Sequence, residues 1–192
     1  STGAAEALAP TRVVKGKATV TLSGVAAGVE SGLTSGATCA SLAIGSGASS
    51  SQTTGNKAAA KTILFDVDGL DAGSYSACII RSGDTCSTAG DFATARKSAA
   101  SLTIVSPTLT TTGAQQSTAS KIMVGSALTG DIIRFSTGSC TGTGTDDVTV
   151  TTDGEVMTGA NLVAGSVTVC FATKEDPTAF TKIGKITVSA KS

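Results

Sequence analysis

Apolar and polar residues alternate along several short stretches of the chain. The stretch 17–22 reads Lys-Ala-Thr-Val-Thr-Leu, and 148–151 and 166–169 alternate valine with threonine or serine in the same way. A period of two places apolar side chains on one face of a β-strand and polar ones on the other. Glycine-rich turns separate these stretches, and we find no amphipathic pattern of the ~10–15 residues that a helix between strands needs. The sequence therefore predicts an all-β protein with half-buried strands packed as a sandwich.

The two halves of the chain share one pattern. Residues 69–80 and 161–172 align at a constant offset of 92. In both halves a glycine shortly precedes an upstream cysteine, and a Leu-Thr-Ile or Ile-Thr-Val segment follows downstream. We therefore expect two domains of one fold, 1–105 and 106–192, joined near Ser106-Pro107. The identical pairs within the aligned segments are Leu70/Leu162, Ala72/Ala164, Gly73/Gly165, Ser74/Ser166 and Cys78/Cys170.

The repeat also constrains how the cysteines pair. Cys39 of the first half corresponds to Cys140 of the second, and Cys78 corresponds to Cys170. The economical assignment is one disulfide in each domain, Cys39–Cys78 and Cys140–Cys170. Each disulfide is expected to stabilise its domain by ~3 kcal/mol. This contribution matters because alanine, serine and threonine bury little apolar surface.

Cys86 has no counterpart in the second half. Three alternatives stay open for it: competition for Cys78, a buried reduced thiol, or a disulfide between subunits. A zinc site is disfavoured, because the chain has no Cys-x-x-Cys motif and no histidine.

Composition and charge narrow the classes of function. The 14 basic residues balance 14 acidic ones, which argues against a nucleic-acid binder or a polybasic membrane anchor. The absence of histidine excludes imidazole-based catalysis and histidine metal ligands. No apolar run approaches the ~18–20 residues of a membrane-spanning helix. We therefore expect no enzyme activity, no cofactor, no bound metal and no membrane span.

One acidic motif, Asp66-Val67-Asp68-Gly69, follows an apolar strand and resembles the first motif of haloacid-dehalogenase-type phosphatases. In that family the first carboxylate is the nucleophile, the second is a general acid/base, and Mg²⁺ neutralises the phosphate. The resemblance implies a parallel sheet covered by helices, and the chain lacks the helical patterns that such a fold needs. We interpret the motif as a strand running into an acidic turn.

Calcium is a further alternative for the acidic residues, although neither candidate set has the spacing of an EF-hand loop. The two candidate sets are Asp66, Asp68 and Asp71, and Asp146, Asp147 and Asp153.

Landmarks along most of the chain suggest a family. The second half contains a strand 131–135 after Gly125, the segment Gly138-Ser139-Cys140, the Leu-Val-Ala-Gly-Ser corner at 162–166, and Cys170. This pattern resembles the tandem Ig-like repeats of extracellular surface proteins. The first half keeps the glycine, cysteine and Ala-Gly-Ser landmarks, but it has no segment that resembles the strand 131–135 of the second half. The resemblance implies two tandem Ig-like β-sandwich domains in an extracellular or cell-surface protein.

A second resemblance concerns the first residues. In architecture the chain is similar to subunits of pilus-like fibres, in which the N-terminal extension of one subunit completes the Ig-like sheet of another. The alternative is that 8–14 is the first strand of the first domain itself, because Leu8 precedes Gly24 by 16 residues, as Leu109 precedes Gly125. The resemblance implies assembly through small or β-forming residues: Ala4, Ala5, Ala7, Leu8, Val13 and Val14.

These observations favour a structural subunit of an extracellular fibre or pilus-like filament. The partner would be the chain itself, in a homopolymer formed through Ig-like domains and donor-strand exchange. The alternative is a monomeric adhesin or binding module of a cell-surface protein. The serine- and threonine-rich loops are candidates for O-linked glycans, since neither Asn56 nor Asn161 begins an Asn-x-Ser/Thr motif.

Overall fold

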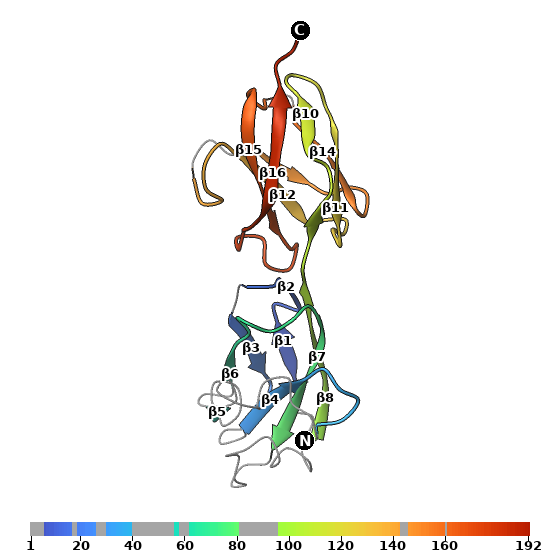
Figure 1. Cartoon of the computed structure of the whole chain (residues 1–192). Coiled ribbons are helices and arrows are strands. Elements are labelled where there is room, and N and C mark those ends of the chain that lie inside the picture. Colours follow the sequence, from blue (N-terminus) through green and yellow to red (C-terminus); the bar gives the residue numbers. More distant parts are fainter. Residues whose placement is uncertain are drawn as a thin grey trace. The chain divides into compact units, whose positions relative to one another are not determined.

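The computed structural model describes residues 6–16, 19–25, 30–39, 56–57, 62–80, 96–142, 146–159 and 161–192. Every regular element in these ranges is a β-strand, which confirms the prediction of an all-β protein (Figure 1). The chain divides into two compact units, Ser1–Ile104 (unit 1) and Val105–Ser192 (unit 2). The boundary between the units lies one residue before the boundary expected from the repeat. In the described part of the chain no helix is long and apolar enough to cross a membrane.

Unit 1 is a sandwich of a three-stranded sheet, in the order β1-β3-β6, and a five-stranded sheet, in the order β2-β8-β7-β4-β5. Its strands are β1 (Ala7–Ala9), β2 (Arg12–Val14), β3 (Thr19–Ser23), β4 (Glu30–Thr34), β5 (Asn56–Lys57), β6 (Thr62–Asp66), β7 (Gly73–Ile80) and β8 (Arg96–Val105).

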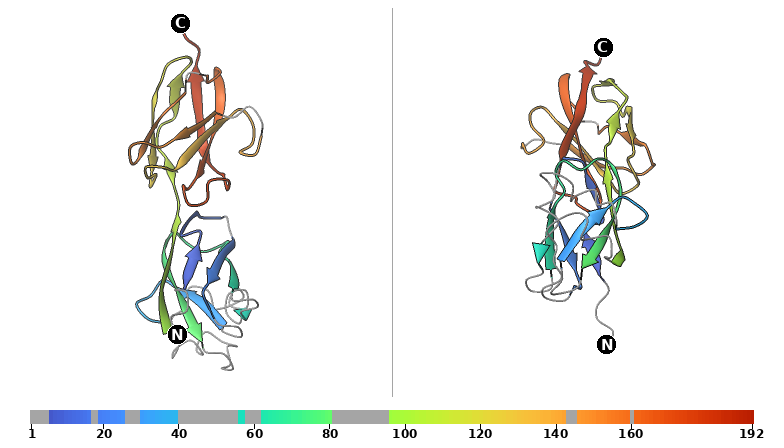
Figure 2. Two further views of the ribbon diagram at one scale, coloured as in Figure 1. Left: turned by 180° about the vertical axis from the view of Figure 1, so that it is seen from behind. Right: turned by 60° about the horizontal axis from the view of Figure 1, so that its bottom comes forward.

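Unit 2 is built in the same way from the sheets β14-β11-β9 and β10-β16-β15-β12-β13 (Figure 2). Its strands are β9 (Thr108–Leu109), β10 (Gly113–Gln115), β11 (Lys121–Gly125), β12 (Ile132–Ser136), β13 (Asp146–Thr149), β14 (Glu155–Met157), β15 (Gly165–Ala172) and β16 (Thr181–Ser189).

The two units have the same topology strand by strand. When β1–β8 are matched in chain order with β9–β16, every strand has the same neighbours in both units. In each unit the first strand is divided between the sheets: β1 and β9 lie in the three-stranded sheets, whereas β2 and β10 lie at the edge of the five-stranded ones. The strand β10 runs parallel to β16, with Gly113 opposite Thr187. This arrangement is that of an Ig-like sandwich.

The alternating pattern of the sequence places the core between the sheets. On β3 and β6 the buried residues Val20, Leu22, Ile63 and Phe65 alternate with exposed or half-exposed ones. They pack with Leu102 and other residues of the opposite sheet in one cluster. Unit 2 follows the same rule, because Ile122 and Val124 on β11 are completely buried, as are Val169 and Phe171 on β15. Three of the five phenylalanines are among the largest fully buried side chains, namely Phe65, Phe135 and Phe171.

The corner before β7 is fixed by the single tyrosine of the chain. The Tyr75 hydroxyl donates a 2.7 Å hydrogen bond to the Asp71 carbonyl oxygen, four residues upstream. Gly73, with a φ of +155°, opens the strand at this corner. A tyrosine bonded in this way to the backbone before the penultimate strand is a feature of immunoglobulin-type sandwiches. Burial raises the pKa of Tyr75, and the nearby Asp71 carboxylate adds to this effect.

Candidate functional site

Each unit contains one disulfide at the same place in the fold. Cys39 is joined to Cys78 and Cys140 to Cys170, with 5.8 Å between the Cα atoms in both cases. Each bond connects the loop after β4 or β12 to the neighbouring strand of the same sheet, β7 or β15. These are the two pairs that the repeat predicts. Cys86 lies outside the described residues.

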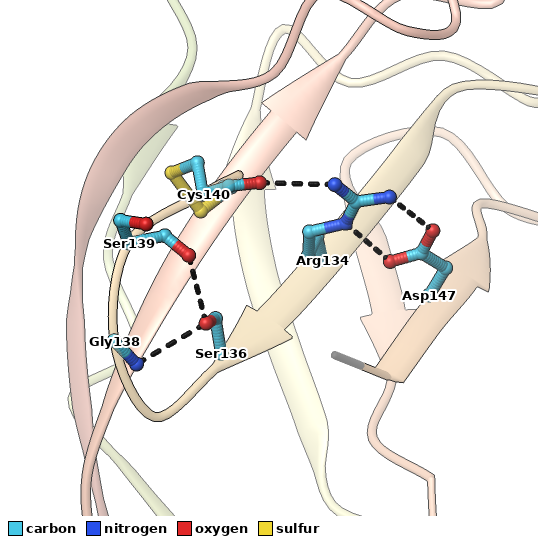
Figure 3. Close-up of polar contacts among 7 residues, drawn as sticks. Arg134, Ser136, Gly138, Ser139, Cys140 and Asp147 are labelled. Carbon is cyan, nitrogen blue, oxygen red and sulfur yellow. Dashed lines mark hydrogen bonds and ion pairs between the residues drawn. A yellow bond between two sulfur atoms is a disulfide. The ribbon is translucent and has the colours of Figure 1, made fainter. Parts of the chain in front are cut away.

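A hydroxyl group shapes the loop that leads to each disulfide. Thr34 Oγ1 accepts a hydrogen bond from the Gly36 N–H at 3.0 Å and donates one to the Thr38 carbonyl at 3.2 Å. In unit 2, Ser136 Oγ accepts from the Gly138 N–H at 3.2 Å and donates to the Ser139 carbonyl at 2.9 Å (Figure 3). Side chains of this type replace backbone partners in tight turns. The two loops thus turn in the same way before their cysteines.

Arg134 connects the loop of unit 2 to the edge of its sheet. Its Nε and Nη2 atoms donate to the two carboxylate oxygens of Asp147 on β13, both at 2.7 Å. Its Nη1 donates to the Cys140 carbonyl at 2.9 Å (Figure 3). The hydrogen bonds with Arg134 lower the pKa of Asp147, and those with Asp147 raise the pKa of Arg134. Such a bidentate pair fixes both side chains in one geometry.

Arg134 also covers a small apolar cluster. Its guanidinium carbon lies 3.7 Å from the centre of the Phe180 ring, a cation–π geometry. Phe180 packs with Cys170 and Ala172, and Ile132 and Cys140 complete the cluster. Cys170 and Ala172 alternate along β15 with Val169 and Phe171, so they lie on the face of the sheet that points away from the main core. The disulfide of unit 2 thus packs beside Phe180, with Cys170 buried and Cys140 partly buried.

A second candidate site lies at one end of unit 2. Three loops meet there, and we call this region the loop end: 126–131, 150–154 and 173–180. Asp131, completely buried, holds it together. Its Oδ2 accepts from the Leu128 N–H at 2.8 Å and its Oδ1 from the Lys174 N–H at 3.0 Å. Its backbone also pairs with Val150, whose N–H donates to the Asp131 carbonyl at 2.8 Å. One carboxylate thus joins two of the three loops.

Asp153 adds a second connection between the loops 150–154 and 126–131, at the surface. Its Oδ1 accepts from the Thr129 N–H at 2.7 Å and from the Thr129 hydroxyl at 2.9 Å. Gly130, with a φ of +98°, makes the turn, and the aliphatic part of Lys174 packs against it. Leu128 stays 46% exposed at the tip. The loop end is therefore a hydrogen-bonded surface that exposes one large apolar side chain, Leu128.

The N-terminal residues expected to mediate assembly lie within unit 1. Leu8 on β1 pairs with Leu22 of β3, and both Leu8 and Val13 belong to the core. Val14 is also buried, whereas Ala7 is exposed. In the single chain this segment is the first strand of its own domain, and its exchange between chains stays a prediction. Ala4 and Ala5 lie outside the described residues.

Four of the six acidic candidates use their carboxylates within the protein. Asp66 Oδ1 accepts from the Asp68 N–H at 3.0 Å within the turn after β6, and Asp71 forms a 2.9 Å ion pair with Lys15. Asp147 and Asp153 bind Arg134 and Thr129. Among the described residues no three His, Cys, Asp or Glu side chains gather around a common point that would hold a metal ion.

The sequence did not reveal Arg134 or Asp131 as important residues. Both lie next to apolar residues in the strand 131–135, which contributes to the Ig-like resemblance as a whole and indicates no role for either residue. A signal was present in each case: a lone arginine within a strand and an aspartate directly after Thr-Gly. Neither signal identifies the partner of the residue. Asp147 lies 13 residues from Arg134 along the chain, and Lys174 lies 43 residues from Asp131.

No family model matches this chain, and no curated protein matches it. Among solved structures, a Bacteroides ovatus surface protein of the mixed-linkage glucan utilization locus, SGBP-B, bound to a mixed-linkage heptasaccharide, is 14% identical, with a TM-score of 0.31. That comparison covers 94% of this chain and 44% of the other, so this chain spans less than half of that protein. Murine CEACAM1b is also 14% identical, with a TM-score of 0.29, over 97% of this chain and 99% of the other.

Proposed function

We propose that the chain is a non-enzymatic binding module of an extracellular or cell-surface protein. The observation that carries this proposal is the loop end of unit 2, where Asp131 and Asp153 hold three loops in one arrangement. A surface that is already ordered loses little conformational entropy when a partner binds. Loops grouped at one end of a rigid sandwich are also the usual place for recognition.

The proposed ligand is a protein surface. Leu128 is an exposed apolar side chain, and its chain neighbour Thr129 is hydrogen-bonded to Asp153, a combination that suits a small interface centre with a polar rim. Stacking of a sugar ring would need an aromatic side chain, and the chain has no tryptophan and a single tyrosine, which is buried in unit 1. The two disulfides support an oxidising, extracellular environment.

An array of cell-surface and matrix glycoproteins tests this proposal. We expect Leu128→Asp to abolish binding to any protein that retains the wild-type chain. Val163→Asp is the matched control, because Val163 is 55% exposed at the corner before β15 and lies outside the loop end. Equal binding by the two variants would place recognition elsewhere, and a wild-type chain that binds nothing on the array would remove the support for this function.

A fibre subunit that exchanges its N-terminal strand is the second candidate. It is favoured by the position of the first strand, whose halves β1 and β2 lie at the edges of two different sheets. Removing residues 1–14 would expose an edge of each sheet and open the core where Leu8 and Val13 now lie. We expect the truncated chain to fold poorly, and a peptide of residues 1–14 to raise its melting temperature. Filaments formed by the truncated chain would exclude this candidate.

A further inference from the structure

Glu6 joins the start of the first strand to the opposite sheet of unit 1. Its carboxylate accepts hydrogen bonds from both terminal nitrogens of Arg96, one of them at 3.1 Å. It also accepts a 2.5 Å hydrogen bond from the Ser98 hydroxyl. Arg96 and Ser98 lie on β8 of the five-stranded sheet, whereas Glu6 directly precedes β1 of the three-stranded sheet. We call these three residues the Glu6 cluster.

The segment that the Glu6 cluster holds makes contacts that a second copy can reproduce. Along β1, Ala7, Leu8 and Ala9 pair with β3 alone, and β2 lies beside β8 alone. The carbonyl of Thr11 accepts a 2.8 Å hydrogen bond from the Thr103 N–H of β8. Exchange of an identical edge segment between two copies restores every one of these contacts in the partner, so its net cost is small. The contacts of Glu6 with Arg96 and Ser98 are restored in the partner as well, so they do not change which arrangement is more stable. They must break before the segment can leave its own unit, so they slow the exchange.

We propose that the Glu6 cluster sets the rate at which residues 6–14 leave their own sandwich and enter the same site of a second copy of the chain. This inference rests on the second candidate function, strand exchange between subunits, and adds the residues that control it. The partner is thus another molecule of this protein, and the surface that receives it comprises the edges of β3 and β8 with the space of Leu8 and Val13.

The charges around Glu6 support a controlling role. Arg96 is the charged side chain that contacts Glu6 among the described residues, and its hydrogen bonds make the largest contribution to lowering the pKa of Glu6. The neighbouring Lys97 points elsewhere, since its Nζ donates to the Gly36 carbonyl at 3.0 Å. Most of the Glu6 side chain is buried, with 18% exposed. A partly buried, charge-assisted contact of this kind holds a segment more firmly than a fully exposed ion pair does.

A disulfide-trapping experiment on the full chain tests the inference. Ala7 and Ser23 are directly opposite on β1 and β3, so cysteines at both positions form a link within one chain when the segment stays in place and between chains when it is exchanged. The background carries Cys86→Ser to remove the unassigned thiol. Glu6→Gln and Arg96→Gln each break the cluster from one side. Lys121→Gln is the matched control, because it breaks a comparable ion pair, Lys121–Glu155 at 3.2 Å, in unit 2.

We expect Glu6→Gln and Arg96→Gln to raise the rate at which chains become linked to each other, measured by oxidising samples at intervals after mixing, roughly tenfold, and Lys121→Gln to leave this rate unchanged. If all three variants match the parent, yet chains become linked after refolding together from urea at high concentration, the Glu6 cluster does not control exchange although exchange occurs. If no variant gives linked chains even after refolding, strand exchange itself is excluded, and the second candidate function with it.

Discussion

Individual side chains determine the shape of the loops in this protein. Thr34 and Ser136 turn the loops that precede the disulfides, and Asp131 joins two loops of unit 2. All three are small polar residues that accept hydrogen bonds from backbone N–H groups. In a chain with few large apolar residues, such contacts carry a larger share of local order than in a protein with a large core.

Replacing Asp131 by alanine tests how much such hydrogen bonds contribute to stability, because Asp131 is completely buried. The substitution removes a completely buried carboxylate and leaves the N–H groups of Leu128 and Lys174 without their acceptor in a partly buried site, which we expect to destabilise unit 2 by about 2–4 kcal/mol. Asp153→Ala is the control. Because Asp153 is exposed, water replaces its contacts and the loss should stay below about 1 kcal/mol. Hydrogen-exchange mass spectrometry of unit 2 peptides in increasing urea measures both, and similar losses would contradict the role of Asp131.

The ionisation of Tyr75 can be followed without overlapping signals from other tyrosines, because it is the single tyrosine of the chain. Burial raises its pKa above the ordinary value of 10.0. The folded state therefore holds the proton more tightly than the unfolded chain does. The corresponding stability is complete below pH 10.0 and is lost as the pH rises through the folded-state pKa. Absorbance near 295 nm should show a higher midpoint in buffer than in urea; equal midpoints would mean that the corner is open.

At the residue scale, the sequence predicts contacts only where the two halves of the chain repeat the same pattern. The cysteines were assigned because Cys39/Cys140 and Cys78/Cys170 occupy equivalent places in two copies of one pattern. Asp131 and Arg134 have no such counterpart, and their partners depend on how distant loops pack. A hydrogen bond across 43 residues, as from Lys174 to Asp131, leaves no periodic trace in the sequence.

At the scale of elements, the alternating pattern predicted the strands and their buried faces, as β3 and β6 demonstrate. It did not predict that the first strand divides between two sheets. The three residues of β1 and the three of β2 are too few to display a period of two. Leu8 of β1 and all three residues of β2 are nevertheless buried, because each half belongs to a different sheet of the same sandwich.

The loop after β12 is an element whose order depends on its disulfide. Cys140→Ser with Cys170→Ser opens a link that spans 30 residues, and we expect unit 2 to lose about 3–4 kcal/mol. The matched control, Cys39→Ser with Cys78→Ser, should lower the stability of unit 1 and leave unit 2 unchanged. Exchange rates of unit 2 peptides that stay at the wild-type level in the first variant would show that Arg134 and Phe180 hold the loop without the disulfide.

At the scale of the whole molecule, the two units repeat one topology although few residues are identical between them. The fold is confirmed as an all-β, Ig-like sandwich, and the prediction succeeded because alternation, corner and cysteine positions are all properties of the backbone arrangement. The sequence contains weaker signals for function than for fold. The small N-terminal residues suggested assembly in the sequence, whereas the structure places Leu8 and Val13 in the core of their own unit.

The central claim is that each chain completes its own sandwiches and therefore acts as a separate binding module. Sedimentation velocity of the purified full chain, at neutral pH and with its disulfides formed, tests this claim most directly. We predict a single species at the mass of one chain, 18.6 kDa, over a wide range of concentration. Growth into filaments, visible in the same sample by negative-stain electron microscopy, would contradict the claim and favour the fibre subunit.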